Sequence, residues 1–214
     1  DIDFSGVGMP ATSFDVDQVE VLRSLRNHLL QVRTHYNAET VNGVLLRNSQ
    51  VARALMGSFA ARFDPALGGD RAAAMAEAEA GVTKSLESVA NLAEDEVLRG
   101  LDNLIRSCLR TNFYPHPQRP VVSIKVDSRK VEGMPSPRPL FEIYVHSRLL
   151  EGIHLRGGKV ARGGIRWSDR QDDFRTEILG LMKTQMVKNS IIVPVGSKGG
   201  FVLKGHVSAR PALD

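Results

Sequence analysis

The amino-acid sequence predicts an α+β or α/β fold in which an all-helical region precedes a region built on a β-sheet. Apolar residues recur at three- and four-residue steps as far as about residue 111, as in amphipathic helices. Three prolines then interrupt the chain between residues 115 and 120, and β-branched runs of strand length follow. Because the helices precede the strands and are not interleaved with them, we expect two domains: a helical domain at residues 1–112 and a partial α/β domain at residues 113–214.

Five helices are expected in the first domain, after an irregular entry segment at residues 1–16. They cover residues 17–35, 38–47, 49–64, 71–92 and 95–111. On the first helix, Arg23, Asn27 and Gln31 fall on the face opposite the apolar stripe. Cys108 lies on the apolar stripe of the last helix. We expect it to be a small core residue and not a catalytic thiol, because no nearby positive charge would lower its pKa.

Strands are expected in the second domain at residues 121–126, 140–145, 153–156 and 190–194. An amphipathic helix is expected between residues 169 and 189. Its apolar row is Phe174, Ile178, Leu181 and Met182. Gln185 continues that row, and helical geometry places Lys188 one turn further on the same inward face. An inward lysine requires an anionic partner, because burying an unpaired charge is costly.

Basic residues stand beside glycines in the segment from residue 158 to residue 204. Arg162 precedes a pair of glycines, and Lys198 lies in an expected loop at residues 195–200 with three glycines around it. Glycines allow the backbone or a ligand to approach the Lys198 amine closely. If Arg162 and Lys188 lie nearby, two cations disfavour a third charge, so we expect Lys198 to accept a proton near neutral pH.

The composition argues against several classes of function. The 28 basic and 24 acidic residues give a net charge of +4 and are interspersed, which does not favour nucleic-acid binding. No apolar run reaches the roughly 18 residues of a membrane span. The single cysteine excludes an internal disulfide, as in a reducing, cytoplasmic setting. The six histidines show no metal-ligand spacing, so we expect no metal site.

The segments VARGGIRWSDRQDDFRTEILGLMKTQMVKN and IIVPVGSKGGF contain a basic-Gly-Gly-aliphatic-Arg-aromatic run, a helix with a lysine at its end, and a glycine-rich loop with a second lysine. This pattern resembles the glutamate dehydrogenase family, and in particular its large, NAD-specific bacterial members, whose chains carry helical segments before the catalytic domain. ARFDP at 61–65 and LRTNFY at 109–114 fit the same type, so the resemblance covers nearly the whole chain. It implies that residues 113–214 begin the substrate-binding part of a catalytic domain.

The resemblance also implies roles for individual residues. Lys198 corresponds to the catalytic lysine, Lys188 with Gln185 to the holders of the α-carboxylate, and Arg162 to the residue that meets the side-chain carboxylate. The substrate-binding set is then Arg162, Gly163, Gly164, Gln185 and Lys188. The common family pattern has lysine where Arg162 stands and glycine where Val195 stands. An arginine keeps the charge but reaches farther and binds a carboxylate through two parallel hydrogen bonds.

The reaction implied by the resemblance is the reversible oxidative deamination of L-glutamate to 2-oxoglutarate and ammonia, with NAD as cofactor. No Gly-x-Gly-x-x-Gly follows an expected strand, so we expect the NAD-binding domain beyond the C-terminal end of this chain. We therefore expect residues 1–214 alone to be a piece of a longer enzyme and to be inactive. The full-length protein is expected to be a cytoplasmic homo-oligomer in amino-acid catabolism, without nucleic-acid or membrane partners.

Several alternatives stay open beside this interpretation. Without the resemblance, an exposed lysine in a glycine-rich turn is the simpler explanation of Lys198. A phosphate-binding loop is disfavoured, because the spacing Gly-x-x-x-x-Gly-Lys-Ser/Thr is missing. For the whole protein, the alternatives are a helical interaction or regulatory module with an inactive dehydrogenase remnant, and a dehydrogenase for another amino acid.

Arg166 and Trp167, which follow the paired glycines, are expected to be structural. We expect Arg166 to pair with a local carboxylate such as Asp169 or Asp173. Trp167 is expected to pack beneath the glycine turn.

Overall fold

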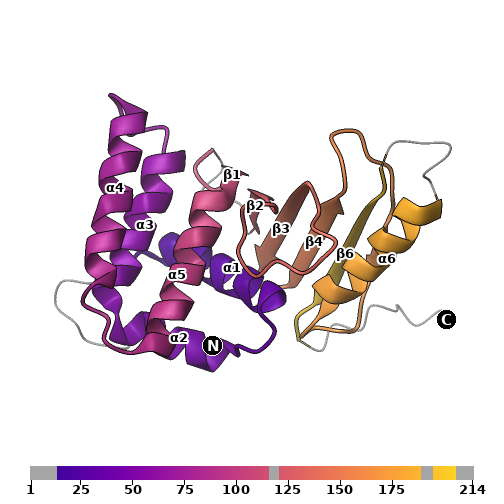
Figure 1. Cartoon of the computed structure of the whole chain (residues 1–214), viewed down its shortest axis with the longest axis horizontal. Coiled ribbons are helices and arrows are strands. Elements are labelled where there is room, and N and C mark those ends of the chain that lie inside the picture. The colour runs from indigo at the N-terminus through magenta and orange to yellow at the C-terminus, as the bar shows by residue number, and fades with distance from the viewer. Residues whose placement is uncertain (1–13, 116–120, 189–194, 206–214) are drawn as a thin grey trace.

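The computed structural model describes residues 14–115, 121–188 and 195–205, and for Lys188 the backbone alone. Its helices are α1 (Val16–Val32), α2 (Ala38–Arg47), α3 (Ser49–Phe63), α4 (Arg71–Leu86), α5 (Leu92–Ser107) and α6 (Phe174–Lys188). Its strands are β1 (Cys108–Thr111), β2 (Val121–Asp127), β3 (Phe141–Ser147), β4 (Leu150–Arg156), β5 (Ile165–Trp167) and β6 (Ser197–Leu203). A helical region followed by a sheet-containing region is thus confirmed (Figure 1). The strand expected at residues 190–194 lies outside the described residues.

Short polar side chains determine where four of the helices begin. At the start of α1, the Asp15 carboxylate accepts the Gln18 backbone N–H at 2.7 Å, and the Asp15 backbone N–H donates to the Gln18 side chain at 3.2 Å. This reciprocal capping box satisfies two backbone donors that a helix otherwise leaves unpaired. The caps of α2, α4 and α5 are Asn37, Asp70 and Asn91.

Two helix ends differ from the sequence-based expectation. The helix expected at residues 71–92 ends at Leu86, because the separately capped α5 starts shortly after it. The helix expected to run to residue 111 ends before Cys108, and Cys108–Thr111 forms the strand β1, which pairs antiparallel with β2. Tertiary strand pairing overrides the helical periodicity there. Cys108 is buried, as expected, and burial raises the pKa of its thiol to about 12.

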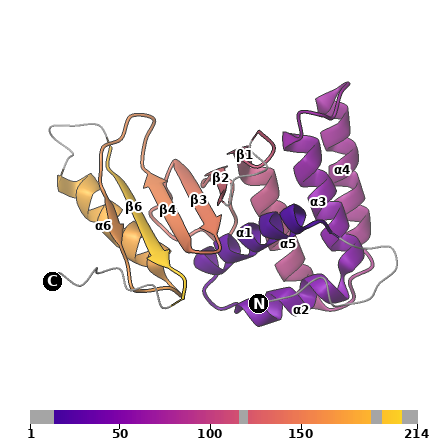
Figure 2. The same cartoon turned by 180° about the vertical axis from the view of Figure 1, so that it is seen from behind.

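Six strands form one mixed sheet in the order β1-β2-β3-β4-β6-β5. All neighbouring strands in that order are antiparallel except β5, which runs parallel to β6. Helices α1 and α5 pack against the β2–β3 part of the sheet, whereas α6 covers β4 and β6 (Figures 1 and 2). Helices α3 and α4 lie at the end of the molecule away from α6.

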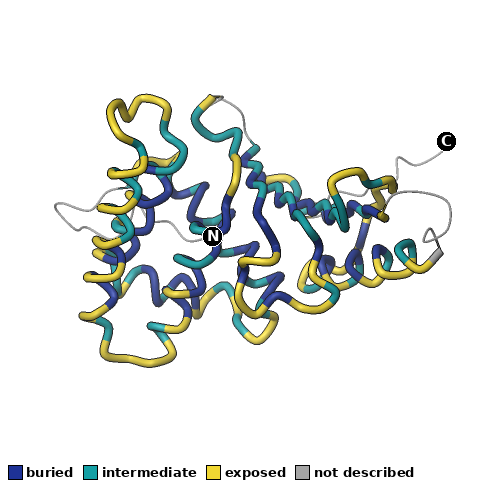
Figure 3. The backbone as a smooth tube through the Cα atoms, turned by 45° about the horizontal axis from the view of Figure 1, so that its top comes forward, coloured by how far each residue is buried: buried dark blue, intermediate teal, exposed yellow. Residues whose placement is uncertain are grey.

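The helices and the sheet share a hydrophobic core. One cluster of buried side chains joins the first five helices to Val122, Ile124 and Val126 of β2. A second cluster joins α6 to the sheet, and its members include Tyr144, Ile153, Leu155, Phe174 and Ile178. Figure 3 shows buried residues both within the helices and along the strands. The core is therefore continuous across residue 112, and the division into two domains there stays a prediction.

Strand β3 buries its polar residues and leaves its apolar residues partly exposed. Glu142, Tyr144 and His146 are buried on the face that meets the helices. The opposite face of β3 carries Phe141, Ile143 and Val145, which are only partly buried. This arrangement reverses the usual half-buried strand, in which the apolar residues face the core.

The polar residues of α1 lie against this buried polar face of β3. Asn27 and Gln31, expected on the face of α1 away from its apolar stripe, are only 9% and 5% exposed, so that face is packed as well. His28 is also buried, and its ring stacks on Tyr144 with 4.7 Å between centroids. Its Nε2 atom lies 2.6 Å from Glu142 Oε1. Buried polar groups are costly unless they are hydrogen-bonded, and Nε2 of His28 finds its partner across the junction of helix and sheet.

Glu142 also binds Arg175 at the start of α6. The guanidinium donates from Nε to Oε1 at 2.9 Å and from Nη2 to Oε2 at 2.8 Å, and both side chains have no exposed surface. Burial acts to raise the pKa of Glu142, but the charge of Arg175 and the hydrogen bond with His28 outweigh it and hold the pKa at about 2. One carboxylate thus connects α1, β3 and α6.

Arg175→Met should lower the free energy of unfolding by about 3–5 kcal/mol, because it leaves the buried Glu142 charge without its main partner. Arg170→Met is the matched control, since Arg170 pairs with Asp173 at the surface and is half exposed. Surface pairs contribute at most about 1 kcal/mol. Urea unfolding followed by circular dichroism measures both variants. Equal midpoints for the two would contradict the importance of the buried pair.

Candidate functional site

The glycine pair after Arg162 lies alongside the start of β6. Ser197 N–H donates to the Arg162 carbonyl at 3.0 Å, and Gly199 N–H donates to the Gly164 carbonyl at 2.9 Å. Arg162 N–H in turn donates to the Val195 carbonyl at 3.4 Å. These bonds extend the parallel pairing of β5 and β6 backwards along the chain. The sequence segments that carry Arg162 and Lys198 are therefore brought side by side.

Lys198 lies in a strand, so the expected glycine-rich loop at residues 195–200 is wrong from Ser197 onward. Lys198 is the second residue of β6 and stands opposite Leu155 of β4. The glycines serve close packing here and not a turn. A Cβ at Gly199 would lie 2.9 Å from Ile165, and a Cβ at Gly200 would overlap Ile178 of α6.

The paired glycines differ in what surrounds them. A Cβ at Gly163 would overlap the carbonyl oxygen of Ser197, so no side chain fits at this position. A Cβ at Gly164 would have only the Lys198 amine near it, at 4.0 Å from Nζ. The amine of Lys198 thus lies over Gly164, where the backbone leaves open space.

Gln185 reaches the same place from α6. Its Cβ would lie 3.0 Å from a Cβ at Gly196, and its Oε1 would lie 3.0 Å from a Cβ at Gly163. The Oε1 atom is buried and has no hydrogen-bond partner among the described residues. A buried unpaired carboxamide atom needs an explanation, and a bound polar ligand is one. Lys188 ends α6, and its side chain lies outside the described residues.

The described part of the site is positively charged and lacks acidic partners. Arg162 is exposed and Lys198 is partly buried. Within residues 14–115, 121–188 and 195–205, neither side chain pairs with a carboxylate. The nearby Glu177 is bound to Arg166 at 3.3 Å. An anionic ligand would complement these two cations.

Of the two contacts expected next to the glycines, the pairing of Arg166 with a local carboxylate is confirmed, though with a different residue from the two named, and the packing of Trp167 is wrong. Arg166 pairs with Glu177 of α6, whereas Asp173 pairs with Arg170. Trp167 is 49% exposed and does not pack beneath the glycine turn. Residues alternate between the two faces of a strand, so Arg166 turns toward α6 and Trp167 turns away from it.

A cleft of about 510 Å³ opens at the other end of β6, away from Lys198. Its lining includes Asn27, Gln31, Glu151 and Lys204, and it includes none of the predicted site residues. Its size is typical of ligand sites. The charged groups Glu151 and Lys204, however, lie 2.7 Å apart and already neutralise each other. Arg162 and Lys198, in contrast, have no carboxylate partner among the described residues. We therefore take the Lys198 region, and not this cleft, as the candidate site.

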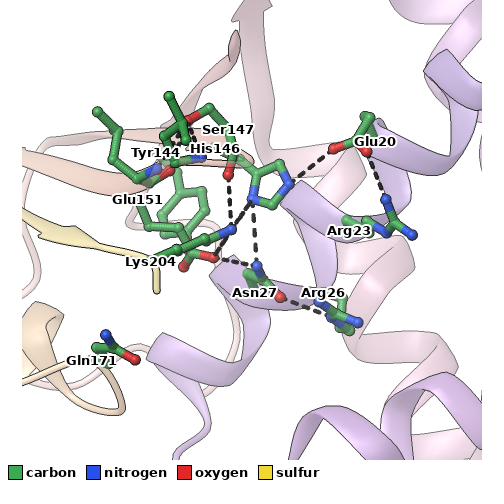
Figure 4. A network of polar contacts seen from close by, with 12 residues as sticks. Glu20, Arg23, Arg26, Asn27, Tyr144, His146, Ser147, Glu151, Gln171 and Lys204 are labelled. Carbon is green, nitrogen blue, oxygen red and sulfur yellow. Dashed lines mark hydrogen bonds and ion pairs between the residues drawn. The ribbon is translucent and has the colours of Figure 1, made fainter. Parts of the chain in front are cut away.

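A second polar network surrounds Glu151 in that cleft (Figure 4). Its carboxylate accepts hydrogen bonds from Tyr144 and Asn27 and binds Lys204. Burial acts to raise the pKa of Glu151, but hydrogen bonds with His146 and Lys204 outweigh it and hold the pKa at about 2. Sequence analysis missed this network and the one at Glu142. The available signal was the alternation of Glu, Tyr and His with apolar residues along β3.

No group of three or more His, Cys, Asp or Glu side chains in the described residues is arranged to hold a metal ion. Among the described helices, none combines the length and the apolarity that crossing a membrane requires.

Comparison with known proteins identifies the family. Residues 81–212 match the family described as "Bacterial NAD-glutamate dehydrogenase, catalytic domain". This chain belongs to that family. Residues 10–65 match "Glutamate dehydrogenase, helical motif 3", so the resemblance noted in the sequence is confirmed for both regions.

Curated relatives agree with the family assignment. The chain is 43% identical over 199 residues to the NAD-specific glutamate dehydrogenase of Halomonas elongata, with 90% of this chain and 12% of the relative covered. It is 43% identical over 202 residues to that of Mycobacterium tuberculosis, with 92% and 12% covered. For that of Pseudomonas aeruginosa, the identity is 42% over 191 residues, with 86% and 12% covered. The chain thus spans about an eighth of the length of these relatives.

Gly163→Ala should lower the free energy of unfolding by at least about 1–3 kcal/mol, because the new methyl group overlaps the Ser197 carbonyl. It should also speed hydrogen exchange at the amides of Ser197 and Gly199, which bind the neighbouring carbonyls. Gly164→Ala is the matched control, since space is available there. Thermal unfolding and hydrogen-exchange mass spectrometry measure both. If the two variants behave alike, the close approach at Gly163 is not present in solution.

Proposed function

We propose that the protein containing this chain is an NAD-dependent glutamate dehydrogenase, which converts L-glutamate reversibly to 2-oxoglutarate and ammonia. One observation carries the proposal: the Lys198 amine lies over Gly164, in the segment that also carries Arg162, and neither cation has a carboxylate partner among the described residues. A doubly negative amino acid complements such a site. The family match disfavours the alternatives, a regulatory module with an inactive remnant or a dehydrogenase for another amino acid.

The two ends of the substrate would be held by different elements. We assign the side-chain carboxylate to Arg162, whose planar fork suits two parallel hydrogen bonds. We assign the α-carboxylate to Gln185 and Lys188 at the end of α6. The side-chain NH₂ of Gln185 can donate to that carboxylate, and its buried, unpaired Oε1 can accept a hydrogen bond from the α-amino group of the substrate. The backbone at Gly163 and Gly164 would let the substrate approach Lys198 without meeting a side chain.

Lys198 would perform the proton chemistry. NAD, when bound, accepts the hydride that leaves the α-carbon of glutamate. The amine of Lys198 then takes a proton from a water molecule, whose oxygen attacks the carbon of the resulting imine. Proton return to the nitrogen releases ammonia and leaves 2-oxoglutarate.

The residues that bind NAD are proposed to lie outside this chain. No Gly-x-Gly-x-x-Gly follows a strand in the sequence. The described residues also provide no glycine-rich turn between a strand and the start of a helix of the kind that binds a dinucleotide pyrophosphate. The substrate side of the reaction is therefore what this chain would supply.

We further propose that the full-length protein is cytoplasmic, acts in amino-acid catabolism, and works as a homo-oligomer without nucleic-acid or membrane partners. The single buried cysteine supports a reducing compartment. The interspersed charges give no support to a nucleic-acid surface.

Lys198→Met in the full-length protein should lower kcat for glutamate oxidation at least about a hundredfold, because general acid–base catalysis is lost. Lys183→Met is the control, since Lys183 is exposed on the outer side of α6. Glutamate-dependent formation of NADH at 340 nm measures both. A kcat unchanged by the Lys198 substitution would rule out its catalytic role.

Arg162→Leu should raise KM for glutamate by about 10- to 150-fold, the loss expected for a charge-assisted hydrogen bond, and should change KM for an apolar amino acid far less. The difference arises because only glutamate has a second carboxylate. Arg148→Leu, a change at an arginine that is 77% exposed, is the control. Equal losses for both substrates would exclude Arg162 as the partner of the side-chain carboxylate.

A further inference from the structure

A side chain from another helix, α1, helps to cap the first turn of α6. Gln31 of α1 accepts the backbone N–H of Arg175 through Oε1 at 3.1 Å. Its Nε2 donates to the carbonyls of Gln171 and Asp172 at 3.1 and 3.0 Å. One buried carboxamide thus binds the backbone on both sides of the entry into α6.

The second attachment at this end is the buried ion pair of Arg175 with Glu142. A cation in the first turn of a helix is unfavourable with respect to the helix dipole. The position of Arg175 is therefore determined by the carboxylate of Glu142. His28 of α1 also binds this carboxylate, at 2.6 Å. Two consecutive turns of α1, carrying His28 and Gln31, consequently hold the start of α6.

The rest of α6 has little room to move against the sheet. Ile178 packs directly on Gly200 of β6, where a Cβ would overlap it. The contact of α6 with the sheet extends from the buried Arg175, at the start of the helix, to Gln185 near its end. Gln185 packs on Gly196. The two ends are separated by about 15 Å of helix. Because the packing is tight along this length, a displacement at Arg175 would also displace Gln185.

We propose that Gln31 is a positioning residue for substrate binding: through α6, the helical region fixes Gln185 and Lys188 at the substrate site. This inference rests on the proposed function, because it assigns α6 the α-carboxylate of the substrate. Gln31 itself touches no substrate. It acts by setting where the binding groups at the far end of α6 stand.

Gln31→Met in the full-length protein tests the proposal. Methionine fills a similar volume but can make none of the three hydrogen bonds. We expect KM for glutamate to rise about tenfold while KM for NAD stays within about twofold, since only the substrate-binding helix is displaced. Initial rates with each substrate varied in turn give both constants. An equal rise in both would indicate general loosening and overturn the positioning role.

Asn42→Leu is the matched control. Asn42 is a buried amide, 8% exposed, that accepts a hydrogen bond from Arg26 of α1 at 2.7 Å, and among the described residues it makes none to α6. Its substitution removes a buried hydrogen bond within the helical region, and KM for glutamate should stay within about twofold of wild type. If Gln31→Met raises this KM no more than Asn42→Leu does, the proposal is wrong while the proposed function stands.

Gln31→Glu provides a second variant in case methionine prevents folding. A carboxylate still accepts the N–H of Arg175 and suits a helix N-terminus, but it cannot donate to the two carbonyls. We therefore expect a rise in KM for glutamate smaller than that of Gln31→Met, about threefold. No rise in this variant, with the methionine variant unfolded, would count against the proposal.

Hydrogen exchange gives a readout that does not depend on activity. Gln31→Met should speed exchange of amides in the first two turns of α6, and Asn42→Leu should not. If the full-length protein fails to reduce NAD with glutamate, the proposed function fails, and exchange still decides whether Gln31 holds α6. Unchanged exchange in Gln31→Met overturns the proposal in either case.

Discussion

The carboxylate of Glu142 is the group on which the arrangement of this molecule depends. It binds Arg175 through both oxygens and His28 through one, and all three side chains are buried. A buried ion pair is weak evidence of net stability, because apolar residues of the same shape are often as stable. What it does impose is geometry. Displacing α1 or α6 on the sheet would separate these side chains and leave a buried charge unpaired.

Glycines determine how closely the elements of the candidate site can approach one another. Gly163, Gly196 and Gly200 stand where a Cβ would press on a carbonyl, on Gln185 or on Ile178. These contacts bring the Arg162 segment, β6 and α6 within van der Waals distance. Three elements can therefore present polar groups to one small volume, which a layer of ordinary side chains would have filled.

Local patterns in the sequence predicted much of this fold, because several elements obey them. The helix at residues 38–47 and the apolar row of α6 follow from helical spacing alone, and both are confirmed. The α1–β3 junction does not follow, since β3 buries Glu142 and His146 while its apolar residues stay partly exposed. A prediction from hydrophobic pattern takes the apolar face of a strand as the buried one. The buried polar face of β3 becomes evident only from its partner residues on α1 and α6. The strand at Lys198 was missed for a related reason: its glycines are required by neighbours distant in sequence.

The buried polar contacts between α1, β3 and α6 also suggest a reason why a helical motif precedes the catalytic domain. The match to helical motif 3 covers residues 10–65 and includes α1, whereas the match to the catalytic domain covers residues 81–212 and includes α6. The two matched regions are thus separate in sequence. In the structure, Gln31 and His28 of the first region supply hydrogen bonds that Arg175 and Glu142 of the second require. Burying those groups without partners would cost several kcal/mol, of the order of a domain's whole stability. The region matched as the helical motif therefore supplies partners to buried groups of the region matched as the catalytic domain, and the two are expected to stabilise each other.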